Sequence, residues 1–206
     1  MSLGAFVLEL PGPLGELTTP AWLRPLAALE ADAPVSRSEE VRQAMRELLR
    51  HGGYKPTGRG KPSAEYLAQA ARKGPLPEIN LVVDLINVVS LHAGLSISVV
   101  DLDLLREPLD VRAAEPDASY VFNASGQTIQ LGGLLCLHDA EGPCANAVKD
   151  AQRTKTHPAT RSVLMLVWGS LEVGAQSAAT LTWLRELAGR VGAVRAVELQ
   201  ALEETP

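Results

Sequence analysis

The spacing of apolar and polar residues predicts an early strand and then an amphipathic helix. Residues 5–10 form a short apolar run with the character of a strand. The sequence Ser-Glu-Glu at residues 38–40 is typical of a helix start. Apolar side chains then recur at helical spacing from Val41 to Leu49, until the glycines at 52 and 53 end the pattern.

A second helix is predicted after a loop rich in turn residues at 55–61. Pro62-Ser63-Ala64-Glu65 has the features of a helix start, with Ser63 as the candidate capping residue. Glycine and proline at positions 74 and 75 break this helix.

The third predicted helix, residues 80–92, is apolar on nearly all sides, and Gly94 follows it as glycine commonly follows a helix. This pattern predicts a buried central helix. Asp84 and Asn87 are its main polar residues and lie on one face, because they are three positions apart. A polar group on a dry face needs a hydrogen-bond partner, so we expect Asp84 to tether a loop. Asn87 is the candidate for a residue that faces a cavity.

Downstream of Gly94 the pattern changes to short strands separated by turn residues. The predicted strands are residues 96–100, 109–113, 120–123, 128–131, 134–138, 162–167 and 194–199, with a helix at 178–188 before the last. Helices followed by a run of strands predict an α+β fold, with helices packed on a mixed or antiparallel sheet.

The composition is that of one folded domain spanning residues 1–206. Hydrophobic residues make up 46% and charged residues 21%, and no uncharged apolar stretch is long enough to cross a bilayer. The first residues lack the basic and apolar regions of a secretory signal. The two cysteines, Cys136 and Cys144, are too few for a disulfide framework and are expected to be reduced and partly buried. A cytoplasmic location without membrane partners follows.

The net charge of -5 argues against a protein that coats nucleic acid through a broad basic face. Two stretches are locally basic, at residues 50–61 and 149–161. Any contact with RNA is therefore expected to be local.

The loop from Gly58 to Ser63 is not a Walker motif, because Lys61 is followed by proline. Arg59 and Lys61 at the start of the next helix could hold an anion, and a plain solvated turn is the equal alternative. His138, Asp139 and Cys144 match no common zinc spacing, and no catalytic triad is recognisable. We therefore predict no metal and no cofactor.

Three motifs resemble known sequences. Residues 80–103, NLVVDLINVVSLHAGLSISVVDLD, resemble the editing-domain signature of the phenylalanyl-tRNA synthetase beta subunit, which runs N-x-V-V-D-V-T-N-Y, then Gly, then P-L-H-A-F-D-L-D. Residues 57–67, TGRGKPSAEYL, and 152–156, QRTKT, are similar to motifs of free-standing relatives of that domain. The resemblance covers approximately residues 38–169 and implies the fold of the editing domain.

In the synthetase this domain hydrolyses tyrosine wrongly attached to tRNA. The resemblance implies a pocket lined by Asn87, which matches the family asparagine. Three other positions differ: Ile86 replaces a threonine, Ser98 replaces the histidine, and Lys155 replaces the acidic residue expected near the last motif. The synthetase reaction is therefore not carried over directly.

The leading hypothesis is a protein that binds the aminoacyl end of tRNA, or a related aminoacyl ligand. Hydrolysis of mischarged aminoacyl-tRNA stays open. The alternatives are a non-catalytic binding module for an amino-acid-like or phosphorylated small molecule, and a structural protein. Candidate catalytic residues are Glu65, Asp84, Asn87 and Ser98. Candidate ligand-binding residues are Arg59, Lys61, Ser63, Asn87, Ser98, Arg153 and Lys155.

Overall fold

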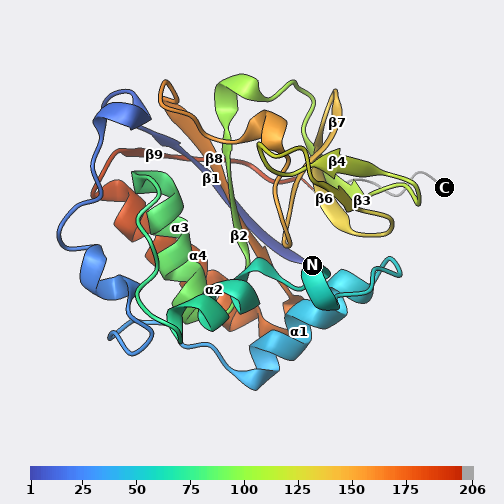
Figure 1. Ribbon diagram of the computed structural model, residues 1–206, viewed down its shortest axis with the longest axis horizontal. Coiled ribbons are helices and arrows are strands. Elements are labelled where there is room, and N and C mark those ends of the chain that lie inside the picture. The colour runs from blue at the N-terminus through green and yellow to red at the C-terminus, as the bar shows by residue number, and fades with distance from the viewer. Residues whose placement is uncertain (201–206) are drawn as a thin grey trace.

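A four-stranded antiparallel sheet forms the centre of the protein in a computed structural model that describes residues 1–200. The strand order is β2-β8-β1-β9 (Figure 1). The strands are β1 (Ser2–Glu9), β2 (Ile97–Asp101), β8 (Ser162–Gly169) and β9 (Ala193–Ala196). β1 and β2 pair with the two edges of β8, so segments from both ends of the chain meet at the middle of the sheet.

Helices cover one face of this sheet. The helices are α1 (Glu39–Arg50), α2 (Ser63–Ala71), α3 (Leu81–Ala93) and α4 (Gly174–Gly189). α3 and α4 pack against each other and against the sheet, and α2 packs on α3 (Figure 1). No helix within residues 1–200 is long and apolar enough to cross a membrane.

Two small sheets lie on the other side of the central sheet (Figure 1). The first has the order β3-β6-β7 and consists of β3 (Asp110–Ala113), β6 (Leu135–Asp139) and β7 (Gly142–Asn146). The second is the hairpin of β4 (Ser119–Val121) and β5 (Thr128–Gln130). These elements confirm the predicted α+β class.

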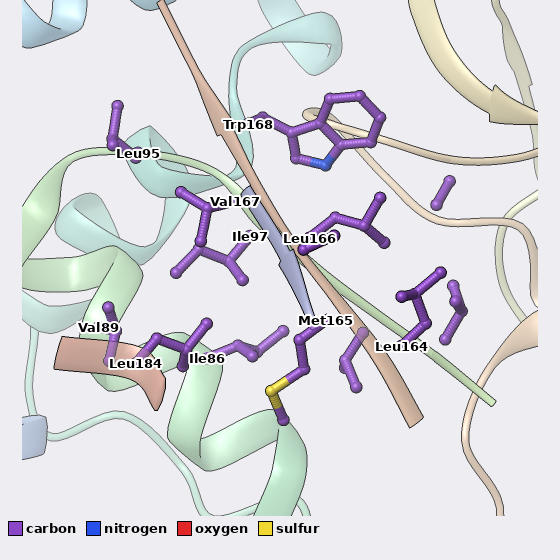
Figure 2. Packing of buried hydrophobic residues seen from close by; sticks show 14 of the residues in the cluster. Ile86, Val89, Leu95, Ile97, Leu164, Met165, Leu166, Val167, Trp168 and Leu184 are labelled. Carbon is purple, nitrogen blue, oxygen red and sulfur yellow. The ribbon is translucent and has the colours of Figure 1, made fainter. Parts of the chain in front are cut away.

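Strand β8 is buried along its whole length, because both of its faces are covered. Met165 and Val167 point toward the helices, whereas Leu166 and Trp168 point toward the small sheets (Figure 2). Alternate side chains of a strand point to opposite faces, so β8 supplies core residues to both layers.

Helix α3 is the predicted buried central helix. The Asn80 side chain caps it by accepting a hydrogen bond from the Val83 amide at 3.0 Å, and Gly94 ends it with a φ of 73°. Asp84 ties down two neighbouring segments, since it accepts hydrogen bonds from the Thr19 hydroxyl and, at 2.9 Å, from the amide of residue 79. The predicted tethering role of Asp84 is confirmed.

One local prediction needs correction, and one strand was missed. Ser63 does not cap α2: it is the first helical residue after Pro62, and its amide donates to the Ala147 carbonyl at 2.9 Å. Strand β7 was not predicted, because its sequence GPCAN contains residues typical of turns. Cys136 and Cys144 lie on β6 and β7, and both are free and fully buried, which is deeper than the predicted partial burial.

We expect Asn80→Ala to lower the free energy of unfolding by about 1 kcal/mol, because the mutation removes the acceptor that satisfies a free amide at the start of α3. Urea unfolding monitored by circular dichroism measures this change. Asn80→Asp is the matched control, since a carboxylate keeps the acceptor and interacts favourably with the helix N-terminus. Equal stability of all three proteins would contradict the capping role.

Candidate functional site

A recess of about 660 Å³ opens where the loop after α1 meets the β4–β5 hairpin. Its charged and aromatic lining residues are Tyr54, Lys55, Arg59, Phe122 and Lys149. The rest of the lining is small or neutral and comes largely from residues 126–130. The two basic stretches of the sequence, 50–61 and 149–161, therefore contribute to one site.

Close backbone contacts place the first basic stretch beside the hairpin. A Cβ atom on Gly52 would stand 2.0 Å from the Gly133 carbonyl oxygen, so this approach requires glycine. A Cβ atom on Gly60 would stand 2.4 Å from the Tyr54 hydroxyl. The Tyr66 hydroxyl of α2 donates to the Gly58 carbonyl at 2.8 Å, which holds the glycine loop against the helix.

Lys149 is held in place through Asn146. The Asn146 side-chain oxygen accepts from the amides of Val148 and Lys149 at 2.8 and 3.0 Å. The Lys149 Nζ atom lies 4.0 Å from the centre of the Phe122 ring, a distance that gives a cation–π interaction. The ammonium group is thus fixed at the wall of the recess.

The recess carries uncompensated positive charge. Among the described residues 1–200, no acidic side chain lines it. Burial, together with the positive charges of Arg59 and Lys155, lowers the pKa of Lys149. Positive charges gathered without acidic partners attract anions.

A buried polar network lies beside the recess, and Ser98 is its centre. The Ser98 hydroxyl donates to the Asp150 carboxylate at 2.7 Å and accepts from the Trp168 indole nitrogen at 2.9 Å. Ser98 is only 1% exposed. Ser98 stands where the resemblance places a histidine in the synthetase domain. Its hydroxyl is buried and already hydrogen-bonded to other residues of the protein.

Lys155 links this network to the recess. Its ammonium group donates to the Phe122 carbonyl at 2.6 Å and interacts electrostatically with Asp150. Burial raises the pKa of Asp150 from 3.8 to about 6, although hydrogen bonds from Ser98 and the Asn146 amide act in the opposite direction. Asp150 was not predicted as a site residue. The feature of the sequence that could have indicated it is its position next to Lys149 in a basic stretch.

The remaining candidate residues lie elsewhere. Arg153 donates to the Asp139 carboxylate through its two terminal guanidinium nitrogens at 2.8 and 2.6 Å, and Glu65 forms a similar pair with Arg46. Lys61 follows the glycine loop but lies outside the set that lines the recess, as does Ser63. The structure thus places Arg59 and Lys155 near Lys149 and leaves Arg153 in an ion pair with Asp139.

Asn87 does not line this recess. It lies on α3, which packs on the helix-covered face of the sheet, whereas the recess is lined by the loop after α1 and by the β4–β5 hairpin. It lines a different cavity, together with Asp84. Tyr54, Lys55, Phe122 and Lys149 were not predicted as site residues, because only folding places the loop, the hairpin and Lys149 together.

The protein is thus an α+β domain with a cationic recess. Comparison with known proteins identifies its family. Residues 39–180 match the model of the B3/4 domain, so the chain belongs to the B3/4 domain family. This result confirms the resemblance inferred from the motifs. No curated protein matches the sequence.

One similar solved structure is an N-terminal fragment of the phenylalanyl-tRNA synthetase beta subunit from Pyrococcus horikoshii. The sequence identity is 17% and the TM-score is 0.44. The similarity covers 55% of this chain and 41% of that fragment, so the chain spans less than half of its length.

We expect Asp150→Asn to change how stability depends on pH. Because the pKa of Asp150 is raised to about 6 in the folded protein, the folded state binds this proton more tightly than the unfolded chain does. Its effect lowers stability as pH rises from about 4 to about 6, by up to about 3 kcal/mol.

Asparagine keeps an oxygen acceptor for Ser98 and Asn146 but does not titrate. The mutant should therefore lack this decline and be more stable than the wild type at pH 7. Urea unfolding at a series of pH values measures the difference, with the exposed Asp117→Asn as the control. Parallel curves for the wild type and Asp150→Asn would show that the carboxyl group is not perturbed.

Proposed function

We propose that this protein binds the aminoacylated 3′ end of a tRNA in the cationic recess and does not hydrolyse it. The observation that carries this proposal is the cluster of Lys55, Arg59 and Lys149 around a recess without acidic side chains among the described residues. Membership of the B3/4 domain family, whose synthetase relatives associate with tRNA, supports RNA as the source of the anion.

The recess suits a nucleotide in size and chemistry. Its volume of about 660 Å³ falls within the usual range for ligand sites. Phosphates of a single strand interact with Lys and Arg, while aromatic side chains such as Phe122 and Tyr54 offer surface to bases. Three cations match the few phosphates of an RNA end, in keeping with a local contact on a chain of net charge -5.

The absence of hydrolysis is proposed because the group at position 98 cannot act on a water molecule. A general base must reach the proton that it abstracts. The Ser98 hydroxyl is buried and occupied by Trp168 and Asp150. Lys155, which replaces the acidic residue expected from the resemblance, has the opposite charge and donates to a backbone carbonyl.

Binding to a short single-stranded RNA with a 3′-amide-linked tyrosine should depend strongly on salt. Three neutralised phosphates predict a slope of about -2 in a plot of log K against log salt concentration. Arg59→Ala should weaken binding and flatten this slope by about 0.7. Fluorescence anisotropy of the 5′-labelled RNA measures both effects.

Arg195→Ala is the matched control. It also removes one positive charge, but Arg195 lies on the edge strand β9 and does not line the recess. An equal effect of Arg195→Ala would show that binding depends on net charge alone, and the recess would lose its role. Displacement of the RNA by millimolar inorganic phosphate would instead favour a phosphorylated small molecule as the ligand.

We expect tyrosyl-tRNA for phenylalanine to be deacylated by this protein no faster than in buffer. Loss of a general acid or base typically costs about two to four orders of magnitude in rate. The assay measures the release of labelled tyrosine, with a synthetase editing domain as the positive control. Turnover comparable to that control, lost in Asp150→Asn, would overturn the proposal and identify Asp150 as the base.

A further inference from the structure

An apolar groove of about 1300 Å³ opens between the central sheet and the small sheet that contains β3. One wall is the segment 107–111, which leads into β3. The other wall consists of residues 1 and 3 at the start of the chain and residues 197–200 after β9. Leu137 of β6 and Leu166 of β8 are both buried and form its floor. Because these two strands belong to different sheets, the groove is an opening into the core between the layers.

Large apolar side chains are exposed at this groove. Met1 and Leu199 are 42% and 50% exposed, and both line it. Leu3, Leu109 and Val111 are partly buried and add to the same surface. A continuous apolar surface with a polar rim is typical of a protein-binding site. The volume of the groove exceeds the usual range for small-molecule sites, so the groove suits a segment of several residues.

The charged side chains at the groove are acidic. Glu107, Asp110 and Glu198 line it, and within residues 1–200 no lysine or arginine does so. Glu107 and Glu198 form no ion pair with any of the described residues. An acidic rim repels nucleic acid and anionic lipid and attracts cationic side chains. This charge distinguishes the groove from the cationic recess, with which it shares no lining residue.

Asp110 has a carboxylate oxygen that lacks a donor. Its Oδ2 atom pairs with Arg112, whereas Oδ1 is buried and has no hydrogen-bond partner among residues 1–200. A buried acceptor without a donor costs stability. The Arg112 side chain is 51% exposed, and an exposed ion pair is weak, so a cationic group of a partner can take its place. Asp110 is also the first residue of β3, an edge strand along which an extended segment can lie.

Charge also decides which occupant the groove favours. A second copy of this chain brings a net charge of -5, and two identical grooves in contact would bring Glu107 and Glu198 close to their counterparts. The chain's own residues 201–206 contain two glutamates and no lysine or arginine. Like charges in contact are unfavourable, so both occupants are disfavoured relative to a cationic partner.

We propose that this groove binds an extended segment of a partner protein in which apolar and cationic residues alternate. Alternate side chains of an extended segment point to opposite faces, so apolar side chains enter the opening between the layers. The lysine or arginine side chains are long enough to reach the rim, where they pair with Glu107, Asp110 and Glu198. The proposal is independent of the RNA site, because a different set of residues carries it.

The test is a titration of labelled hexapeptides with the full-length protein, followed by fluorescence anisotropy. In these peptides lysine or arginine alternates with leucine, valine or phenylalanine, and at least one of them should bind saturably. Peptides in which glutamate replaces the cationic residues should bind at least about tenfold more weakly, because like charges repel. Failure of every cationic peptide to bind at millimolar concentrations, or equal binding of the acidic peptides, would overturn the proposal.

Matched mutants locate the bound peptide. Leu199→Ser removes exposed apolar surface from the groove and should weaken binding about fivefold. Leu171→Ser is its control, since Leu171 is 74% exposed and does not line the groove. Glu107→Gln and Glu198→Gln should each weaken binding about threefold, with Glu186→Gln on α4 as their control. Equal effects of the groove mutations and their controls would show that the peptide binds elsewhere, which overturns the proposal.

Two further measurements separate the other occupants from this one. The oligomeric state in analytical ultracentrifugation should be the same for the wild type and Leu199→Ser. A dimer that dissociates in Leu199→Ser would show that a second copy fills the groove, which overturns the proposal. Arg59→Ala should weaken RNA binding and leave peptide binding unchanged, and a loss of peptide binding in this mutant would place the peptide at the recess instead.

Discussion

The burial of β8 on both faces is the constraint on which the rest of the structure depends. An apolar strand in the middle of an antiparallel sheet must exclude water from two sides, and here helices cover one side and small sheets the other. The side chains of β8 point alternately into the helical layer and into the layer of small sheets (Figure 2). Neither layer can be removed without exposing large apolar side chains such as Trp168 and Met165.

The same constraint determines the role of Ser98. Ser98 pairs with Leu166 of β8 and faces the small sheets, where the indole of Trp168 is fully buried. A buried indole N–H needs an acceptor, and Ser98 supplies it. Ser98 in turn needs an acceptor for its own proton, which is Asp150. This chain of three hydrogen-bonded partners gives Ser98 a structural role in the packing of the two layers.

Much of the fold could be predicted from the sequence, because α1 and α3 have clear apolar periodicity and local end signals. Ser38, Asn80 and Gly94 act within a few residues of their own positions, so the sequence around them contains the needed information. β7 could not be predicted, because its pairing with β6 overrides a composition typical of turns. Ser63 was assigned as a cap by residue type, but Pro62 occupies that position.

The candidate sites were predictable only in part, for a topological reason. Asn87 and Ser98 are close in the sequence, but the helix carries one on one side of the sheet and β2 places the other side chain on the opposite side. Arg59 and Lys149 are far apart in the sequence and meet through the approach of Gly52 to Gly133. Sequence spacing reports distances along an element but not the layer in which the element packs.

The distribution of ion pairs explains why the recess stands out on an acidic protein. Arg46 and Arg153 are neutralised by carboxylates within hydrogen-bond distance, and such pairs leave little charge for a ligand. At the recess, in contrast, cations are gathered without acidic partners among the lining residues, and their repulsion disfavours the folded state. An arrangement that costs stability is expected where function requires it. On the binding function proposed above, an anion that enters the recess recovers this cost.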